Sequence, residues 1–142
     1  MTAKKPLIAV VDDDESVCRA MERLVRSLGM VAETYASSED FMNQIESLPS
    51  FHLDCVILDV QMPGLNGIEV QTRLRRIHKS MPVIFITAHD DRAAQEQALA
   101  GGALAFLRKP CNDALLIRTL DAALGRRRPD EKSRGPDGDK AK

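Results

Sequence analysis

The stretch "CVILDVQMPGLNG", residues 55–67, contains the strongest structural signal in the chain. Four apolar residues lead directly into Asp59, and four turn formers follow between residues 63 and 67. A continuous run of this kind is typical of a strand that is buried on both faces in a parallel sheet. A carboxylate at the end of such a strand needs polar company. We therefore expect Asp59 to face a pocket that other strand ends share.

Five apolar runs alternate with helical patterns along the chain. The runs are "LIAVV" (7–11), "VAETY" (31–35), "CVIL" (55–58), "VIFI" (83–86) and "LAFL" (104–107). Three of them are almost continuously apolar, which indicates central strands, whereas "VAETY" alternates and is placed at a sheet edge.

The segments between these runs carry helical stripes and helix ends. A first stripe has Val17, Met21, Leu24 and Leu28, with Gly29 as the stop. Ser37 or Ser38 can cap the second helix, whose packed face is Phe41, Ile45 and Leu48 before Pro49. Three more helices are predicted from about Gly67 to Ile77, from Asp91 to Gly101–Gly102, and from Asn112 through Leu116, Leu120 and Leu124.

The alternation predicts an α/β fold in which a strand–helix unit occurs five times. Such a chain forms a doubly wound, five-stranded parallel sheet with right-handed crossovers. We assign residues 5–125 to this one domain. Residues 126–142 are highly charged and contain one apolar residue, Ala141, so they are expected to form a disordered tail or a linker.

Composition excludes several classes of function. The whole chain has a net charge of −1, and residues 126–142 carry seven basic and four acidic residues. The rest of the chain is therefore acidic, which argues against direct nucleic acid contact. No apolar run approaches the roughly 20 residues that a membrane span needs, and the N-terminus lacks the features of a signal peptide. Cys18, Cys55 and Cys111 are odd in number and not at metal-binding spacing. Reduced thiols in a cytoplasmic protein are therefore expected.

Polar side chains follow four of the five predicted strands. Asp12, Asp13 and Asp14 follow the first strand, Asp59 the third, Thr87 the fourth, and Lys109 with Pro110 the fifth. Ligands of open α/β sheets bind at the carboxyl ends of the strands, so these groups are expected to converge. We assign Asp14 to capping the first helix.

The converging groups suit phosphoryl chemistry. Clustered carboxylates repel one another, and a hard cation such as Mg²⁺ relieves that repulsion. A carboxylate beside a metal, a lysine and a threonine can accept a phosphoryl group, because each oxygen of that group then has a partner.

Four motifs, in order, resemble those of response-regulator receiver domains, which have the CheY-like fold. They are "VVDDDES" (10–16), "ILDVQMPGLNG" (57–67), "VIFITAHDD" (83–91) and "FLRKP" (106–110), and "ITAHDD" looks most like receivers of the FixJ type. The resemblance covers about residues 5 to 125. It implies a flavodoxin-like sheet with strand order 2-1-3-4-5.

The resemblance also implies the role of each site residue. Asp59 would be the phosphoacceptor, and Thr87 and Lys109 would bind the phosphoryl oxygens. Mg²⁺, with Mn²⁺ as a substitute, would be held by Asp12, Asp13, Asp59 and the backbone carbonyl of Gln61. Thr87 and Phe106 would form the switch, and the Lys109–Pro110 bond would be cis.

The implied function is a two-component phosphorelay switch, not an enzyme beyond self-phosphorylation from small phosphodonors and autodephosphorylation. Its partners would be a histidine kinase or phosphotransfer protein, and a downstream protein or its own output domain. A homodimer on phosphorylation is a further expectation. The responsive surface would be the fourth helix, the fifth strand and the fifth helix.

Two alternative functions compete with this hypothesis. A phosphatase with an aspartyl-phosphate intermediate would need a second Asp two residues after the nucleophile, where this chain has Gln61. A nucleotide-binding flavodoxin-like protein would need a Gly-rich loop after the first strand. His52 and His78 are interpreted as surface residues, and His89 as a rim residue that influences water access. The run 126–128 is interpreted as solvated rather than phosphate-binding.

Overall fold

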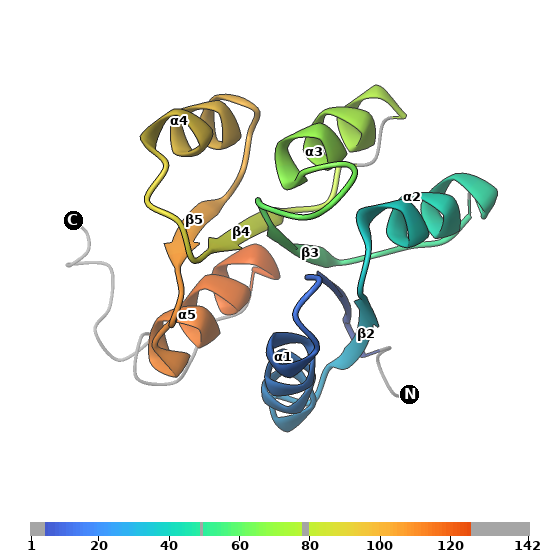
Figure 1. Cartoon of the computed structure of the whole chain (residues 1–142). Coiled ribbons are helices and arrows are strands. Elements are labelled where there is room, and N and C mark those ends of the chain that lie inside the picture. The colour runs from blue at the N-terminus through green and yellow to red at the C-terminus, as the bar shows by residue number, and fades with distance from the viewer. Residues whose placement is uncertain (1–4, 49, 78–79, 126–142) are drawn as a thin grey trace.

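The computed structural model describes residues 5–48, 50–77 and 80–125. Within these residues, five strands alternate with five helices, and Figure 1 shows their arrangement. The elements are β1 (Leu7–Val11), α1 (Glu15–Ser27), β2 (Val31–Tyr35), α2 (Ser38–Ser47), β3 (Cys55–Asp59), α3 (Gly67–Arg76), β4 (Val83–Thr87), α4 (Arg92–Ala100), β5 (Ala105–Arg108) and α5 (Asp113–Ala123). The sheet is parallel throughout and has the order β2-β1-β3-β4-β5, so the predicted fold and the edge position of β2 are confirmed.

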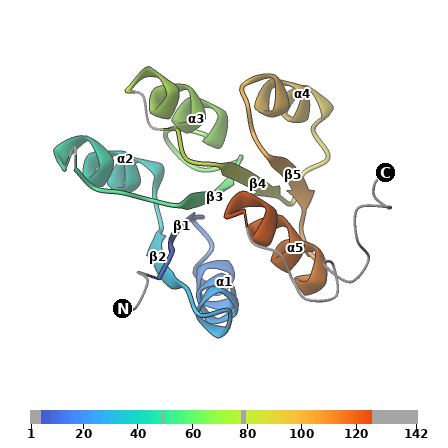
Figure 2. The ribbon, with the colours of Figure 1, turned by 180° about the vertical axis from the view of Figure 1, so that it is seen from behind.

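Helices cover both faces of the sheet. α2, α3 and α4 lie on one face and α1 and α5 on the other, as Figure 1 and the reverse view in Figure 2 show. Successive strand residues point to opposite faces. In β4, Phe85 joins the cluster under α2–α4, whereas Ile84 and Ile86 join the cluster under α1 and α5. Burial on both faces accounts for the almost unbroken apolar runs of the central strands.

Side-chain caps fix where the helices begin. Asp14, Ser37, Asn66, Asp91 and Asn112 each accept a backbone N–H from the first turn that follows. Asp14 caps α1 as expected, and of the two serines considered for α2 it is Ser37 that caps the helix. Asn66 and Glu69 form a reciprocal capping box at α3.

Two packing predictions are wrong in detail. Leu48 was expected on the packed face of α2, but it is 47% exposed. α2 ends at Ser47, and the backbone of Leu48 (φ −126°, ψ 82°) leaves the helical path that would have carried its side chain inward. The fifth strand begins at Ala105 rather than Leu104, because the ladder with β4 starts at the pair Ile84–Ala105. Leu104 is exposed, and its N–H donates to the Val83 carbonyl at 2.8 Å just before the ladder. Pro49, His78 and the run 126–128 lie outside the described residues.

A matched pair of substitutions in α5 tests the packing of the cluster under α1 and α5. Leu120 is fully buried, whereas Leu115 on the same helix is 39% exposed. Leu120→Ala should lower the free energy of unfolding by about 3 kcal/mol, because it removes buried methyl groups and leaves a cavity. Leu115→Ala should change it by less than about 1 kcal/mol. Urea unfolding followed by circular dichroism measures both, and equal losses would contradict the assigned face of α5.

Candidate functional site

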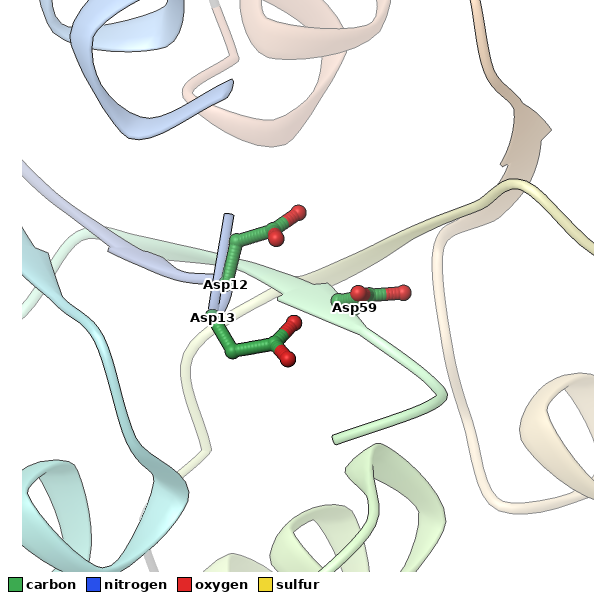
Figure 3. A group of neighbouring side chains, drawn as sticks. All are labelled: Asp12, Asp13 and Asp59. Carbon is green, nitrogen blue, oxygen red and sulfur yellow. The ribbon is translucent and has the colours of Figure 1, made fainter. Parts of the chain in front are cut away.

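Three carboxylates meet at the carboxyl ends of β1 and β3, two neighbouring strands in the middle of the sheet. Asp59 is the last residue of β3, and Asp12 and Asp13 directly follow β1. The pairing of Val11 with Leu58 sets these strand ends side by side. One oxygen from each carboxylate lies within 4.8 Å of the others, with Asp12 and Asp59 buried and Asp13 exposed (Figure 3). The predicted convergence of these acids is therefore found in the structure.

Lys109 reaches this group from the end of β5. Its Nζ lies 2.7 Å from Asp12 Oδ2 and 3.4 Å from Asp59 Oδ2. Its backbone N–H donates to the Thr87 carbonyl at 2.8 Å, which fixes the start of the following loop beside β4. The Lys109–Pro110 peptide bond is cis, as the family resemblance implied.

The electrostatics of the site are unbalanced around Asp59. Burial and then the charge of Asp12 raise its carboxyl pKa, and Lys109 and the Gln61 backbone only partly oppose this. Burial by itself lowers the pKa of Lys109, but the hydrogen bond to Asp12 and the nearby carboxylate charges outweigh it, so that pKa is raised. Within the described part of the chain, Asp59 Oδ1 is buried without a hydrogen-bond partner. That oxygen can therefore accept a hydrogen bond or bind a cation through its lone pairs.

Thr87 and Phe106 lie on the neighbouring strands β4 and β5. Thr87 ends β4 and is almost fully buried, and its Oγ1 accepts the His89 N–H at 3.2 Å. Its own hydroxyl proton remains available to a further acceptor. Phe106 on β5 pairs with Phe85 on β4, and their ring centroids are 5.9 Å apart. Phe106 is only half-buried, so it borders both the core and the surface.

Gln61, His52 and His89 lie where the sequence analysis placed them. Gln61 follows Asp59 by two residues in the exposed loop between β3 and α3. His89 is exposed at the rim of the site. His52 is a surface residue at the opposite end of β3, where Nε2 lies 3.1 Å from Asp54 Oδ1.

Sequence reasoning missed three contacts around the site. The Cys18 thiol on α1 donates to the Asp12 carbonyl at 3.2 Å, beneath the carboxylates. Ser38 and Glu39, at the start of α2, both hydrogen-bond to Leu65 in the loop after Asp59. For Ser38 and Glu39 the sequence indicated only a place at the start of a helix. A contact between residues 26 or more positions apart has no signature in a single sequence.

The residues of the site fit a magnesium ion. Asp12, Asp13 and Asp59 offer hard anionic oxygens, and Asp59 Oδ1 has no partner among the described residues. Mg²⁺ prefers such oxygens and usually keeps several waters and takes one or two carboxylates. A bound ion would neutralise charge where the carboxylates repel one another.

Comparison with known proteins agrees with this geometry. The family model for the response regulator receiver domain matches residues 8–121. The chain belongs to this family. It is 34% identical over 136 residues to the response regulator protein TodT of Pseudomonas putida, covering 96% of this chain and 58% of TodT. It is 37% identical to nodulation protein W of Bradyrhizobium diazoefficiens, covering 87% of this chain and 53% of that protein. The chain thus spans little more than half the length of these two relatives.

Solved structures support the same assignment. A response regulator receiver protein from Burkholderia phymatum is 58% identical, with a TM-score of 0.78, covering 88% of this chain and 99% of that one. The structure titled FixJ-N is 25% identical, with a TM-score of 0.76, covering 87% and 96%. The resemblance to FixJ-type receivers is therefore confirmed, and the domain is a signalling module of two-component systems. Among the residues that the structure describes, no helix has the length and apolar character that a membrane span requires.

The raised pKa of Asp59 predicts that Asp59→Asn increases the stability of the domain, by an amount that depends on pH. When the pKa of a carboxyl is raised in the folded state, folding favours its protonated form. Its ionisation therefore opposes folding above the folded-state pKa, and it has no effect on stability well below the unfolded-state pKa. Without divalent metal at pH 7, Asp59→Asn should therefore stabilise the domain by about 1 kcal/mol, and the gain should shrink as the pH falls through the acid range.

Urea unfolding at a series of pH values, with EDTA present, measures this difference. Glu96→Gln, which neutralises an exposed acid on α4, is the control and should change stability little at any of these pH values. A gain from Asp59→Asn that is absent at pH 7, or that grows as the pH falls, would show that the carboxylate cluster does not oppose folding.

Proposed function

We propose that the domain accepts a phosphoryl group on Asp59 from a histidine kinase or a phosphotransfer protein, and that Mg²⁺ is required. The observation that carries this proposal is the buried Oδ1 of Asp59, which has no hydrogen-bond partner among the described residues and lies within a group of three carboxylates and one lysine. A structural acid at a strand end would have its oxygens hydrogen-bonded. Here one oxygen is left free to bond to phosphorus or to a metal.

Each residue of the site has a role in the transfer. A carboxylate oxygen of Asp59 attacks phosphorus while the phosphorus–nitrogen bond of the donor phosphohistidine breaks, and the leaving imidazole takes up a proton. Lys109, held by Asp12, offers its ammonium group to the phosphoryl oxygens, and the Thr87 hydroxyl donates to another. Asp12, Asp13, Asp59 and the Gln61 carbonyl would hold Mg²⁺ or Mn²⁺, which supplies positive charge to the transferred group.

The phosphorylated state switches a surface formed by α4, β5 and α5. Thr87 and Phe106 connect the site to this surface, because Thr87 pairs with Arg108 and Phe106 lies two residues earlier on the same strand. The surface exposes large apolar side chains, among them Leu99 on α4 and Leu115 on α5. Its partner is a downstream protein, an output domain of the same polypeptide, or a second copy in a homodimer.

The remaining features of the chain support a switch rather than an enzyme. The exposed Gln61 occupies the position where an aspartyl-phosphate phosphatase would need its acid/base carboxyl. Turnover is thus limited to self-phosphorylation from small phosphodonors and autodephosphorylation, on which His89 acts through water access. The receiver comprises residues 5–125, residues 126–142 are a charged tail or linker, and the domain works in the cytoplasm without direct contact to nucleic acid or membrane.

Phosphorylation by acetyl phosphate or by a phosphorylated histidine kinase tests the phosphoacceptor. The parent chain should gain one phosphoryl group in the presence of Mg²⁺ and none in EDTA, as measured by intact mass. Asp59→Asn should abolish the gain, because the amide cannot attack phosphorus. Asp14→Asn, which alters a capping acid next to the same cluster, should retain it. Full phosphorylation of Asp59→Asn would refute the assignment.

A second test concerns Thr87 as the link to the interaction surface. Thr87→Ala should still accept phosphate. The amide NMR shifts that beryllofluoride induces around Phe106 and α4 should largely disappear, because this variant lacks the hydroxyl that moves to bind the phosphoryl group. Thr87→Ser keeps the hydroxyl and should retain most of those shifts. If Thr87→Ala shows the full parental set of shifts, Thr87 does not carry the signal.

A further inference from the structure

The loop that follows Asp59 is held from the side by the first turn of α2. The Ser38 hydroxyl donates to the Leu65 carbonyl at 2.6 Å, and the Leu65 N–H donates to Glu39 Oε2 at 3.1 Å. Two adjacent side chains thus bind both polar groups of one loop residue. Ser38 is fully buried. We call Ser38 and Glu39, with these two hydrogen bonds, the α2 clamp.

The shape of the loop is adapted to the Glu39 carboxylate. Gly64 adopts φ +78°, a left-handed conformation that side chains rarely allow. A Cβ at this position would collide with the Glu39 carboxylate, which occupies that space. The hydrogen bond from Leu65 is also the main reason why the pKa of Glu39 is lowered. Glu39 is an exposed residue, and its carboxylate lies against the loop and accepts the Leu65 N–H.

The other end of the loop is closed onto the sheet. The Gly67 N–H donates to the Val60 carbonyl at 2.9 Å, and the capping box at Asn66 fixes the entry into α3. A Cβ on Gly67 would collide with the Asp59 carbonyl, so the loop returns directly against the strand end. The α2 clamp adds a lateral support to the segment that includes Gln61, beside the buried side chains of Val60 and Met62, which anchor it in the core.

We propose that Ser38 and Glu39 are positioning residues for the metal site. They hold the loop so that the Gln61 backbone carbonyl faces the carboxylates of Asp12, Asp13 and Asp59. This inference rests on the proposed function, because it assigns Mg²⁺ to that site. Groups that orient metal ligands from outside the coordination shell strongly affect affinity, and here the oriented ligand is a backbone carbonyl.

Mg²⁺ titrations of three Glu39 and Glu46 variants test the clamp. Glu39→Ala removes the acceptor of the Leu65 N–H and should weaken Mg²⁺ binding by about 10-fold. Glu39→Gln removes the same charge but keeps a carbonyl acceptor, so its affinity should stay within about 2-fold of the parent if positioning is what matters. Glu46→Ala removes an exposed acid of the same helix and should behave like the parent.

Two readouts separate positioning from a general loss of structure. NMR-monitored Mg²⁺ titration gives the affinity of the folded population, and amide hydrogen exchange at Leu65 should accelerate in Glu39→Ala but not in Glu39→Gln. For phosphorylation by acetyl phosphate, Glu39→Ala should raise the Mg²⁺ concentration for half-maximal rate, while the rate at saturating Mg²⁺ approaches that of the parent. Ser38→Ala, which removes the second hydrogen bond, should shift the same quantity in the same direction.

The outcomes distinguish this inference from the proposed function. A Glu39→Ala chain that binds Mg²⁺ as tightly as the parent would overturn the clamp and leave the phosphoacceptor intact. Equal weakening in Glu39→Ala and Glu39→Gln would also overturn it, because lost charge rather than lost position would then explain the effect. A parent chain that neither binds Mg²⁺ nor accepts phosphate would overturn the proposed function together with the clamp.

Discussion

The crowding of three carboxylates at the ends of two buried strands is the constraint on which this molecule depends. Asp12 and Asp59 are buried beside each other, and the raised pKa of Asp59 is the electrostatic consequence. Lys109 approaches both, at 2.7 Å and 3.4 Å, but it does not fully compensate them. The packed sheet keeps the carboxylates close together, whereas mutual repulsion would separate them if their side chains were free in water. This arrangement fits a cation and supports the proposed phosphoryl transfer to Asp59.

The sheet also links the chemistry to the surface over a short path. Thr87 ends the strand next to that of Asp59, and its carbonyl binds the amide of Lys109, one residue beyond the end of β5. The same pair of strands brings Phe106 against Phe85. In the proposed switch, a change in the position of Thr87 would act on β5, which is itself part of the proposed interaction surface. On the opposite side of the site, α2 contacts the loop after Asp59, so the site is supported from both directions.

Most of this arrangement could be predicted from the sequence, because it depends on regular periodicity. The apolar runs located the strands, and the polar residues that follow them located Asp59, Thr87 and Lys109 at one edge. Leu48 was misplaced because a helical stripe does not show where the backbone leaves the helix. The contacts of Ser38 and Glu39 with the loop were not predictable, since they depend on how α2 is placed against α3 in space.

The parallel register restricts how this domain can vary in length. Shifting one strand by a single residue turns its buried side chains to the opposite face, and it would move Asp59 away from Asp12 or Thr87 away from Lys109. Insertions within strands, or in the short loop closed by Gly67 and Val60, therefore disturb the site at once. The loops at the amino ends of the strands, which connect each helix to the next strand, carry none of these site residues. Evolutionary changes in loop length should accumulate there, while the site edge keeps a constant spacing.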